Sequence, residues 1–209
     1  MRKFLEIGGF LAGALLIAFG VVAIYMGVDG RSTVRDSLRQ EQIVGTADMT
    51  PAAIKDEAAQ AGRPPSIKLP TTAVAGKAID TGARARAFAS YIRIHALEAT
   101  GGQVYSQMAR YASADGKGTS DPTLALKDSK GQPVANPLRE TWIQAMTLST
   151  ALNTSYMASQ LSLFAVVVGV AFLLAGLGFG ILAFSVFRLP AMVAKAKQAA
   201  APAGKLQTT

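Results

Sequence analysis

The chain has 209 residues, of which 50% are hydrophobic and 16% are charged, and its formal net charge is +8. An apolar fraction this high excludes a disordered chain and argues against an ordinary soluble domain. The sequence contains no cysteine and one histidine. Disulfide frameworks, cysteine-ligated zinc, iron–sulfur clusters and any site that needs two imidazoles are therefore excluded, and we expect a small basic membrane protein that is mainly α-helical.

The first apolar segment runs from Ile7 to Met26 without a charged residue. Its length matches the roughly 30 Å of a bilayer hydrocarbon core at about 1.5 Å per helical residue. The basic residues Arg2 and Lys3 before it are also typical of a signal peptide. The apolar stretch is too long for one, however, and residues 24–28 lack a small-x-small cleavage pattern. We predict a retained transmembrane helix within residues 1–28.

The second apolar segment runs from Leu161 to Phe187, again without a charge, and predicts a transmembrane helix over 161–187. In both segments glycines recur at spacings of four and seven, which places them on one helix stripe. Small residues on a stripe let helices approach closely, whereas an alternative is that glycine is simply common in membrane spans. The glycines predicted to pack are Gly9, Gly13, Gly20, Gly169, Gly176 and Gly180.

Charge on the short flanks predicts the orientation of the two spans. Arg2 and Lys3 precede the first span, and residues 188–209 contain four basic residues and no acidic one. Residues 29–160 contain 15 basic and 12 acidic residues. The positive-inside rule then places both termini in the cytoplasm and the central domain outside the cell membrane. Residues 188–209 form a basic cytoplasmic tail, of which residues 191–209 are expected to be mobile. Most of the net positive charge flanks the spans and is expected to anchor the chain in the membrane, so no nucleic-acid partner is expected.

The central domain, residues 29–160, is predicted to be mostly helical. Gly45 is expected to stop the continuation of the first span, and proline-bearing residues 62–76 form an extended connector. Thr50 and Thr81 precede helix-forming segments and are expected to be N-caps. The predicted helices cover about 51–61 and 82–100, with one or two further turns around Tyr105, Met108 and Tyr111.

A long helix is predicted to begin at Asn136 and Pro137 and to continue into the second span. Apolar residues recur at alternating intervals of four and three from Leu138 to Leu177, which predicts a stalk helix of roughly 50 residues, or about 75 Å. It follows a polar loop over 113–134. Asp115 and Asp121 in that loop lack the ligand pattern of a calcium loop, so no calcium site is expected.

Residues capable of chemistry are few. His95 has Tyr91 one turn before it and Glu98 three residues after it, and we expect a hydrogen-bonded core histidine and not a metal ligand. Glu6 is expected at the membrane interface, an intramembrane role being the alternative. The glycine-rich residues 176–180 (GLGFG) are expected in the middle of the membrane and form no phosphate loop. We therefore predict no catalytic residue, no metal and no cofactor.

Several strings of residues resemble an uncharacterised family of small actinobacterial two-span membrane proteins. They are residues 45–51 (GTADMTP), 75–77 (AGK), 80–86 (DTGARAR), 94–102 (IHALEATGG) and 152–157 (LNTSYM). Proteins of this kind often carry the label of an aromatic ring-opening dioxygenase. Such an enzyme needs ferrous iron held by two histidines and a carboxylate or an equivalent set, which one histidine cannot supply. The resemblance implies a topology and no activity.

Two functions remain open. The first is a non-enzymatic structural or accessory subunit that docks on a membrane or envelope complex. Its partners would be the lipid bilayer and either another protein or a second copy bound through the spans, with Trp142, Tyr156 and His95 as contacts of the central domain. The alternative is a ligand-sensing or binding module that signals through a partner, since two spans flanking an outer helical domain are also typical of receptor input regions.

Overall fold

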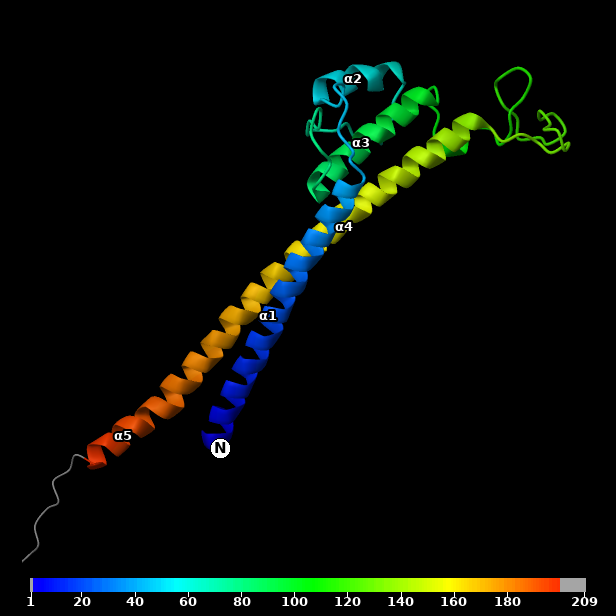
Figure 1. Ribbon diagram of the computed structural model, residues 1–209. Helices are drawn as coiled ribbons and strands as arrows, with labels where there is room; N and C mark the ends of the chain where they lie inside the picture. The colour runs from blue at the N-terminus through cyan, green and yellow to red at the C-terminus, as the bar shows by residue number, and fades with distance from the viewer. Residues whose placement is uncertain (1, 200–209) are drawn as a thin grey trace, which may run out of the picture. The chain divides into compact units, whose positions relative to one another are not determined.

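The computed structural model describes residues 2–199 and is mainly helical (Figure 1). No strand occurs in these residues, and the connectors pair only through isolated β-bridges such as that between Val44 and Ala78. The predicted fold class is confirmed to this extent. The helices are α1 (Arg2–Gln40), α2 (Pro51–Gln60), α3 (Gly82–Ala99), a 3₁₀ turn η1 (Tyr105–Gln107), α4 (Pro137–Ala183), a π-helical turn η2 (Phe184–Arg188) and α5 (Leu189–Ala199).

The chain divides into two compact units. The span unit contains Met1–Asp29 and Leu161–Thr209, of which residues 2–29 and 161–199 are described. The helical unit contains Gly30–Gln160.

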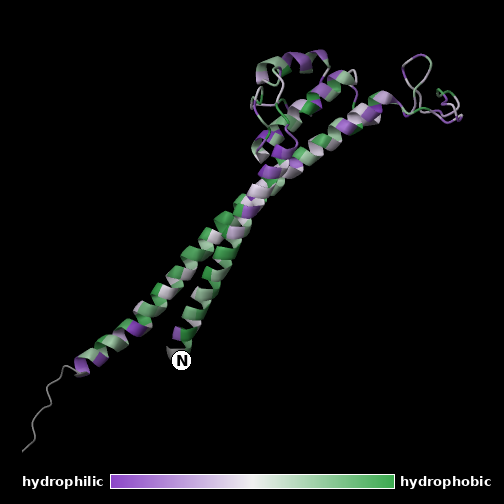
Figure 2. Cartoon of the chain, viewed as in Figure 1, coloured by the Kyte–Doolittle hydropathy of each residue, from purple (hydrophilic) through white to green (hydrophobic). Residues whose placement is uncertain are grey.

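Two helices are long and apolar enough to cross a membrane (Figure 2). One is α1 from Phe4 onward, and the other is the continuous run from α4 through α5. Only 11% of the most apolar stretch of each is buried. A core helix of a soluble protein would be mostly buried, so the exposed apolar surface is that expected of helices in contact with lipid.

In the span unit, α1 and α4 pack against each other in antiparallel fashion through glycines. A Cβ built on Gly13 would lie 2.8 Å from the carbonyl oxygen of Gly176, and one built on Gly27 would lie 2.6 Å from that of Ser162. Gly9 makes a looser approach, 3.1 Å from the Cβ of Ala183. The helices thus pack backbone against backbone within a single chain, as small residues permit.

Gly180 differs from the other glycines predicted to pack. A Cβ built on it would meet nothing within 4 Å. The contacts on α4 recur every seven residues, at Ser162, Gly169, Gly176 and Ala183, so a residue four positions after Gly176 lies off the stripe. Gly180 nevertheless lies at the helix contact, because its backbone nitrogen lies 3.3 Å from a Cβ built on Gly13, although a side chain at position 180 would itself point into open space.

The predicted long helix is confirmed, since α4 covers 47 residues without a break. Past Ala183 the chain stays helical, so the predicted mobile tail is wrong as far as Ala199; residues 200–209 lie outside the described part. Pro190 has no N–H to continue the usual ladder. The turn before it shifts to a π-helix, in which Leu189 N–H bonds to Phe184 O.

Glu6 forms an ion pair that the sequence did not predict. The Nε of Arg188 lies 3.0 Å from the Glu6 Oε1 and donates a hydrogen bond to it. The Arg188 guanidinium also lies 5.9 Å from the centre of the Phe10 ring. The ion pair thus joins Glu6 to a residue 182 positions later in the chain.

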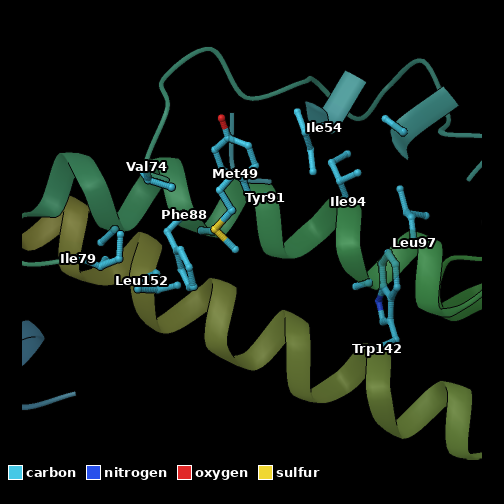
Figure 3. Close-up of a cluster of buried hydrophobic side chains, with 14 of the residues drawn as sticks. Met49, Ile54, Val74, Ile79, Phe88, Tyr91, Ile94, Leu97, Trp142 and Leu152 are labelled. Atoms are coloured by element: carbon cyan, nitrogen blue, oxygen red, sulfur yellow. The ribbon is translucent and has the colours of Figure 1, made fainter. Parts of the chain in front are cut away.

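The core of the helical unit lies between α2, α3 and the first part of α4 (Figure 3). Both predicted N-caps are confirmed: Thr50 Oγ1 accepts a hydrogen bond from Ala53 N at 3.2 Å, and Thr81 Oγ1 from Arg84 N at 3.3 Å. These caps begin the two helices whose buried faces meet. The fully buried large side chains of the unit are Ile54, Val74, Ile79, Tyr91, Ile94 and Leu97.

The segment after α3 contains less helix than predicted. Only Tyr105–Gln107 form a helical turn, because Tyr111 instead pairs with Thr119 and Ala135 in isolated bridges. In the following loop Asp121 accepts hydrogen bonds from the backbone and hydroxyl of Thr123. That carboxylate therefore closes a turn, as Asp115 does with Ser113 and Lys117.

Candidate functional site

Three side chains from separate segments meet in the helical unit: Asp48 from the loop after α1, Glu57 from α2 and His95 from α3. The His95 Nε2 lies 3.1 Å from Asp48 Oδ2 and 3.4 Å from Glu57 Oε2. One potential ligand atom from each residue lies within 4.8 Å of the other two. The cluster therefore combines one imidazole and two carboxylates, the kinds of group that bind divalent metals.

The core of the unit fixes the backbone at all three positions. Asp48 lies in a turn in which Met49 N donates to Thr46 O, and the Met49 side chain is buried. Glu57 is flanked on α2 by Ile54 and Ala58, which are both buried. His95 follows the fully buried Ile94 on α3, so packing of α2 on α3 sets the spacing between Glu57 and His95.

The two carboxylates have opposite pKa shifts. The hydrogen bond from the Thr46 side chain is the largest cause that lowers the pKa of Asp48, and His95 lowers it further. Burial raises the pKa of Glu57; the nearby Glu98 and Asp48 carboxylates raise it too, while His95 opposes them. The cluster thus keeps a readily ionised acid at its exposed side, where the Asp48 side chain is 49% exposed, and a desolvated acid at its buried side.

Two atoms of the cluster lack hydrogen bonds. His95 Nε2 and Glu57 Oε1 are buried and have no hydrogen-bond partner in the described part of the chain. The Asp48 and Glu57 oxygens lie close enough to Nε2 to form ion pairs, but neither is hydrogen-bonded to it. Buried polar atoms are nearly always satisfied, so each exception calls for an explanation.

The partners of His95 differ from those expected. The Tyr91 hydroxyl donates to Thr72 O at 3.1 Å and not to the histidine, and Glu98 lies beside Glu57. The prediction of a hydrogen-bonded core histidine is wrong for Nε2, because that atom has no such bond. Asp48 and Glu57 were missed because nothing in their sequence spacing indicates that the loop and α2 fold over α3.

Trp142 and Tyr156, the other predicted partner contacts, are both engaged within the helical unit. Trp142 is 6% exposed and points from α4 toward α3, so most of its surface is covered by the core of the unit (Figure 3). The ring of Tyr156 lies under the Arg86 guanidinium, at 4.8 Å, and its hydroxyl accepts a hydrogen bond from Gln160.

An apolar groove runs along α4 beside Trp142. It has a volume of about 560 Å³, and large side chains on its wall are partly exposed: Tyr105 is 44% and Ile143 is 40% exposed. The Arg139 guanidinium lies over the Tyr105 ring at 4.0 Å and so borders the groove at its rim beside Tyr105, although Arg139 does not itself line the groove. The residues that line the groove are Tyr105, Trp142, Ile143, Met146, Thr147, Thr150 and Ala151.

Comparison of the chain with protein-family models, with curated proteins and with solved structures found no match. The resemblance to a two-span family therefore remains a prediction, and functional inference depends on the geometry of the cluster and the groove.

Proposed function

We propose that this protein is a non-enzymatic integral membrane protein, an accessory subunit that docks on a larger membrane or envelope complex. Two helices long and apolar enough to cross a bilayer support the membrane location. The flanking charges support an orientation with both termini in the cytoplasm and residues 29–160 outside. In this arrangement, the chain enters and leaves the helical unit through a span, and the unit is held at the outer membrane surface.

The single observation that carries the docking proposal is the apolar groove beside Trp142. Its wall presents Tyr105 and Ile143, and Leu138 on the same helix is 38% exposed. Scattered apolar side chains are normal on a surface, but contiguous ones that line a concave surface are typical of interaction sites. The aromatic Tyr105 and the rim arginine Arg139 belong to the residue types enriched at protein interfaces.

We infer that the occupant is an apolar segment of a partner membrane protein that carries an acidic residue at its edge. The groove walls are apolar, and Arg139 provides a positive charge at the rim. A hydrophobic centre with a charged rim is the usual organisation of a protein interface. The buried Trp142 would form the floor of the groove and stiffen it, while the half-exposed Ile143 and Tyr105 make the contacts.

The experiment is site-specific photocrosslinking in native membranes. A photoreactive amino acid replaces Ile143 or Thr147 in the groove, and the control places it at the exposed Lys55 on α2. We expect one discrete adduct from both groove positions and none from Lys55, with an Arg139→Glu substitution reducing its yield. Equal labelling from Lys55, or no adduct from the groove, would contradict docking at this surface, and an adduct of twice the chain mass would indicate self-association instead.

A second candidate is a ligand-binding module, which the cluster of Asp48, Glu57 and His95 favours. Within the part of the chain that the structure describes, these three side chains have residue types and a spacing that suit a small cationic ligand. Binding at the cluster and docking at the groove involve different residues, so the two functions are separable by experiment.

A further inference from the structure

We propose that Asp48, Glu57 and His95 form a binding site for a divalent transition metal, with Zn²⁺ as the ion of choice. The site goes beyond the docking function and does not depend on it. The proposal reverses the expectation from the sequence, which considered only the pair of His95 and Glu98. The structure adds Asp48 and Glu57 and thereby supplies three ligands from three segments.

Two of the three distances between the ligand atoms fit tetrahedral coordination. Zinc bonds of about 2.0–2.1 Å to nitrogen and oxygen place neighbouring ligand atoms of a tetrahedron about 3.3 Å apart. The observed separations from His95 Nε2 are 3.1 Å to Asp48 Oδ2 and 3.4 Å to Glu57 Oε2. All three ligand atoms lie within 4.8 Å of one another, so a metal ion would draw the two carboxylates together around Nε2.

The hydrogen-bonding state of the cluster is an independent indication of a cation. The buried Nε2 of His95 faces two carboxylate oxygens without a hydrogen bond to either. Each of the three residues offers one ligand atom, and the three atoms converge from three segments of the chain. A divalent ion satisfies all three at once and compensates the charge of the buried Glu57, whereas a single proton satisfies at most one pair.

The donor set selects the class of metal. Mg²⁺ and Ca²⁺ prefer oxygen ligands in six or more positions, whereas imidazole suits zinc and the later first-row metals. Three protein ligands leave the fourth tetrahedral position to another group. Because the Asp48 side chain is 49% exposed, that position faces solvent and is accessible to water or to a donor atom from a partner.

Metal binding would join three elements of the helical unit. Asp48 belongs to the loop that follows α1, Glu57 to α2 and His95 to α3. The α2 helix has only 10 residues and is too short to be stable in isolation, so it depends on contacts with the rest of the unit. A zinc ion would fix α2 and the loop to α3, so we expect metal binding to stabilise this part of the unit.

The test uses the full-length chain in mild detergent, without a histidine tag, after removal of metal by EDTA. Zinc chloride is titrated in, and the bound metal is measured by calorimetry and by elemental analysis after gel filtration. We expect one zinc ion per chain and a rise in the unfolding temperature on zinc addition. Because the chain has one histidine, modification of His95 by diethyl pyrocarbonate reports directly on that ligand, and zinc should protect it.

Glu57→Gln and His95→Gln each remove one ligand with little change of shape. Glu140→Gln is the matched control, because it removes an exposed carboxylate in the first turn of α4, away from the cluster. We expect the first two variants to bind zinc at least about 10-fold more weakly, since even outer-shell changes weaken metal sites by that factor. The control should bind like the parent chain, and zinc should not protect His95 in Glu57→Gln.

Two results would overturn the proposal. One is the absence of stoichiometric zinc from the parent chain together with unchanged His95 modification on zinc addition. The other is retention of zinc by His95→Gln, which would assign the binding to surface carboxylates. Circular dichroism of the metal-free variants shows whether they fold. If a variant does not, protection of His95 in the parent chain decides the question.

Discussion

Gly20 on α1 and Gly169 on α4 face each other so closely that neither position has room for a side chain. A Cβ built on Gly20 would lie 2.7 Å from the Gly169 carbonyl oxygen, and one built on Gly169 would lie 2.7 Å from the Gly20 carbonyl oxygen. The contact is reciprocal, as it is between Gly13 and Gly176. Such contacts define the register of the helix pair and allow direct tests of it.

A disulfide can test whether the two helices pair within one chain. The Cβ of Gly9, if present, would lie 3.1 Å from that of Ala183, so moving the two apart by a few tenths of an ångström would bring the pair to the roughly 3.5–4.5 Å that a disulfide requires. We expect Gly9→Cys combined with Ala183→Cys to form an intrachain disulfide on oxidation, since the chain has no other cysteine. Denaturing gels would show a monomer with altered mobility. The control pair Gly8→Cys and Ala183→Cys should not crosslink, because Gly8 has open space around it; a crosslinked dimer from the first pair would contradict the hairpin.

The second prediction concerns overpacking at Gly176. The substitution Gly176→Ala should destabilise the helix pair by about 1–3 kcal/mol, because the added methyl group meets the Gly13 backbone and cannot be relieved by a rotamer change. Gly178→Ala should be neutral, since a Cβ there meets nothing within 4 Å. The yield of the disulfide between positions 9 and 183 measures the pairing in both backgrounds. Equal disulfide yields would show that the contact between Gly176 and Gly13 does not stabilise the helix pair.

The third prediction concerns Trp142. Because this tryptophan is the only one in the chain and is 6% exposed, its fluorescence should be blue-shifted and protected from iodide in the purified protein without any partner. Leu97→Ala, in the same core, should lower the free energy of unfolding by about 2–5 kcal/mol when followed by this signal. Ile143→Ala, at a 40% exposed position, should cost about 1 kcal/mol or less. A solvent-quenched Trp142 would contradict the core position.

The fourth prediction concerns topology. If the flanking charges orient the spans as proposed, a cysteine that replaces Ser120 should react with a membrane-impermeant maleimide in intact cells. A cysteine that replaces Lys197 should react only after the membrane is permeabilised. Both side chains are exposed in the structure, so access is controlled by the membrane and not by burial. Reaction of both sites in intact cells would contradict the orientation.

Local signals in the sequence were sufficient to predict most of the helices. Thr50 and Thr81 cap α2 and α3 because an N-cap depends on a few adjacent residues, and the apolar repeat from Leu138 predicts α4 for the same reason. The π-helical turn before Pro190 and the extended course of Tyr111 were not predicted. Each depends on a competing interaction, the missing N–H of a proline and the pairing with Thr119.

Tertiary relationships were predictable only where the sequence repeats. The glycine spacing identified Gly13, Gly20, Gly169 and Gly176, whereas Gly180 has its backbone at the contact and its Cβ position in open space. The contact of Asp48 and Glu57 with His95 had no signal at all, because it depends on how a loop and a short helix fold onto α3. The burial of Trp142 in the core was not predicted, because a large aromatic residue on a helix stripe has the same pattern in a core as at an interface.

The seven-residue recurrence of the span contacts restricts how α1 and α4 move relative to each other. Sliding one helix along the other would drive bulky side chains against the glycine backbone; Ile24 and Ile17 already lie 2.7 Å from Cβ atoms built on Gly169 and Gly176. A piston motion of one span past the other would break all of these contacts together. Any mechanical signal carried by this pair must therefore move both helices as one rigid body, by tilt or rotation in the bilayer.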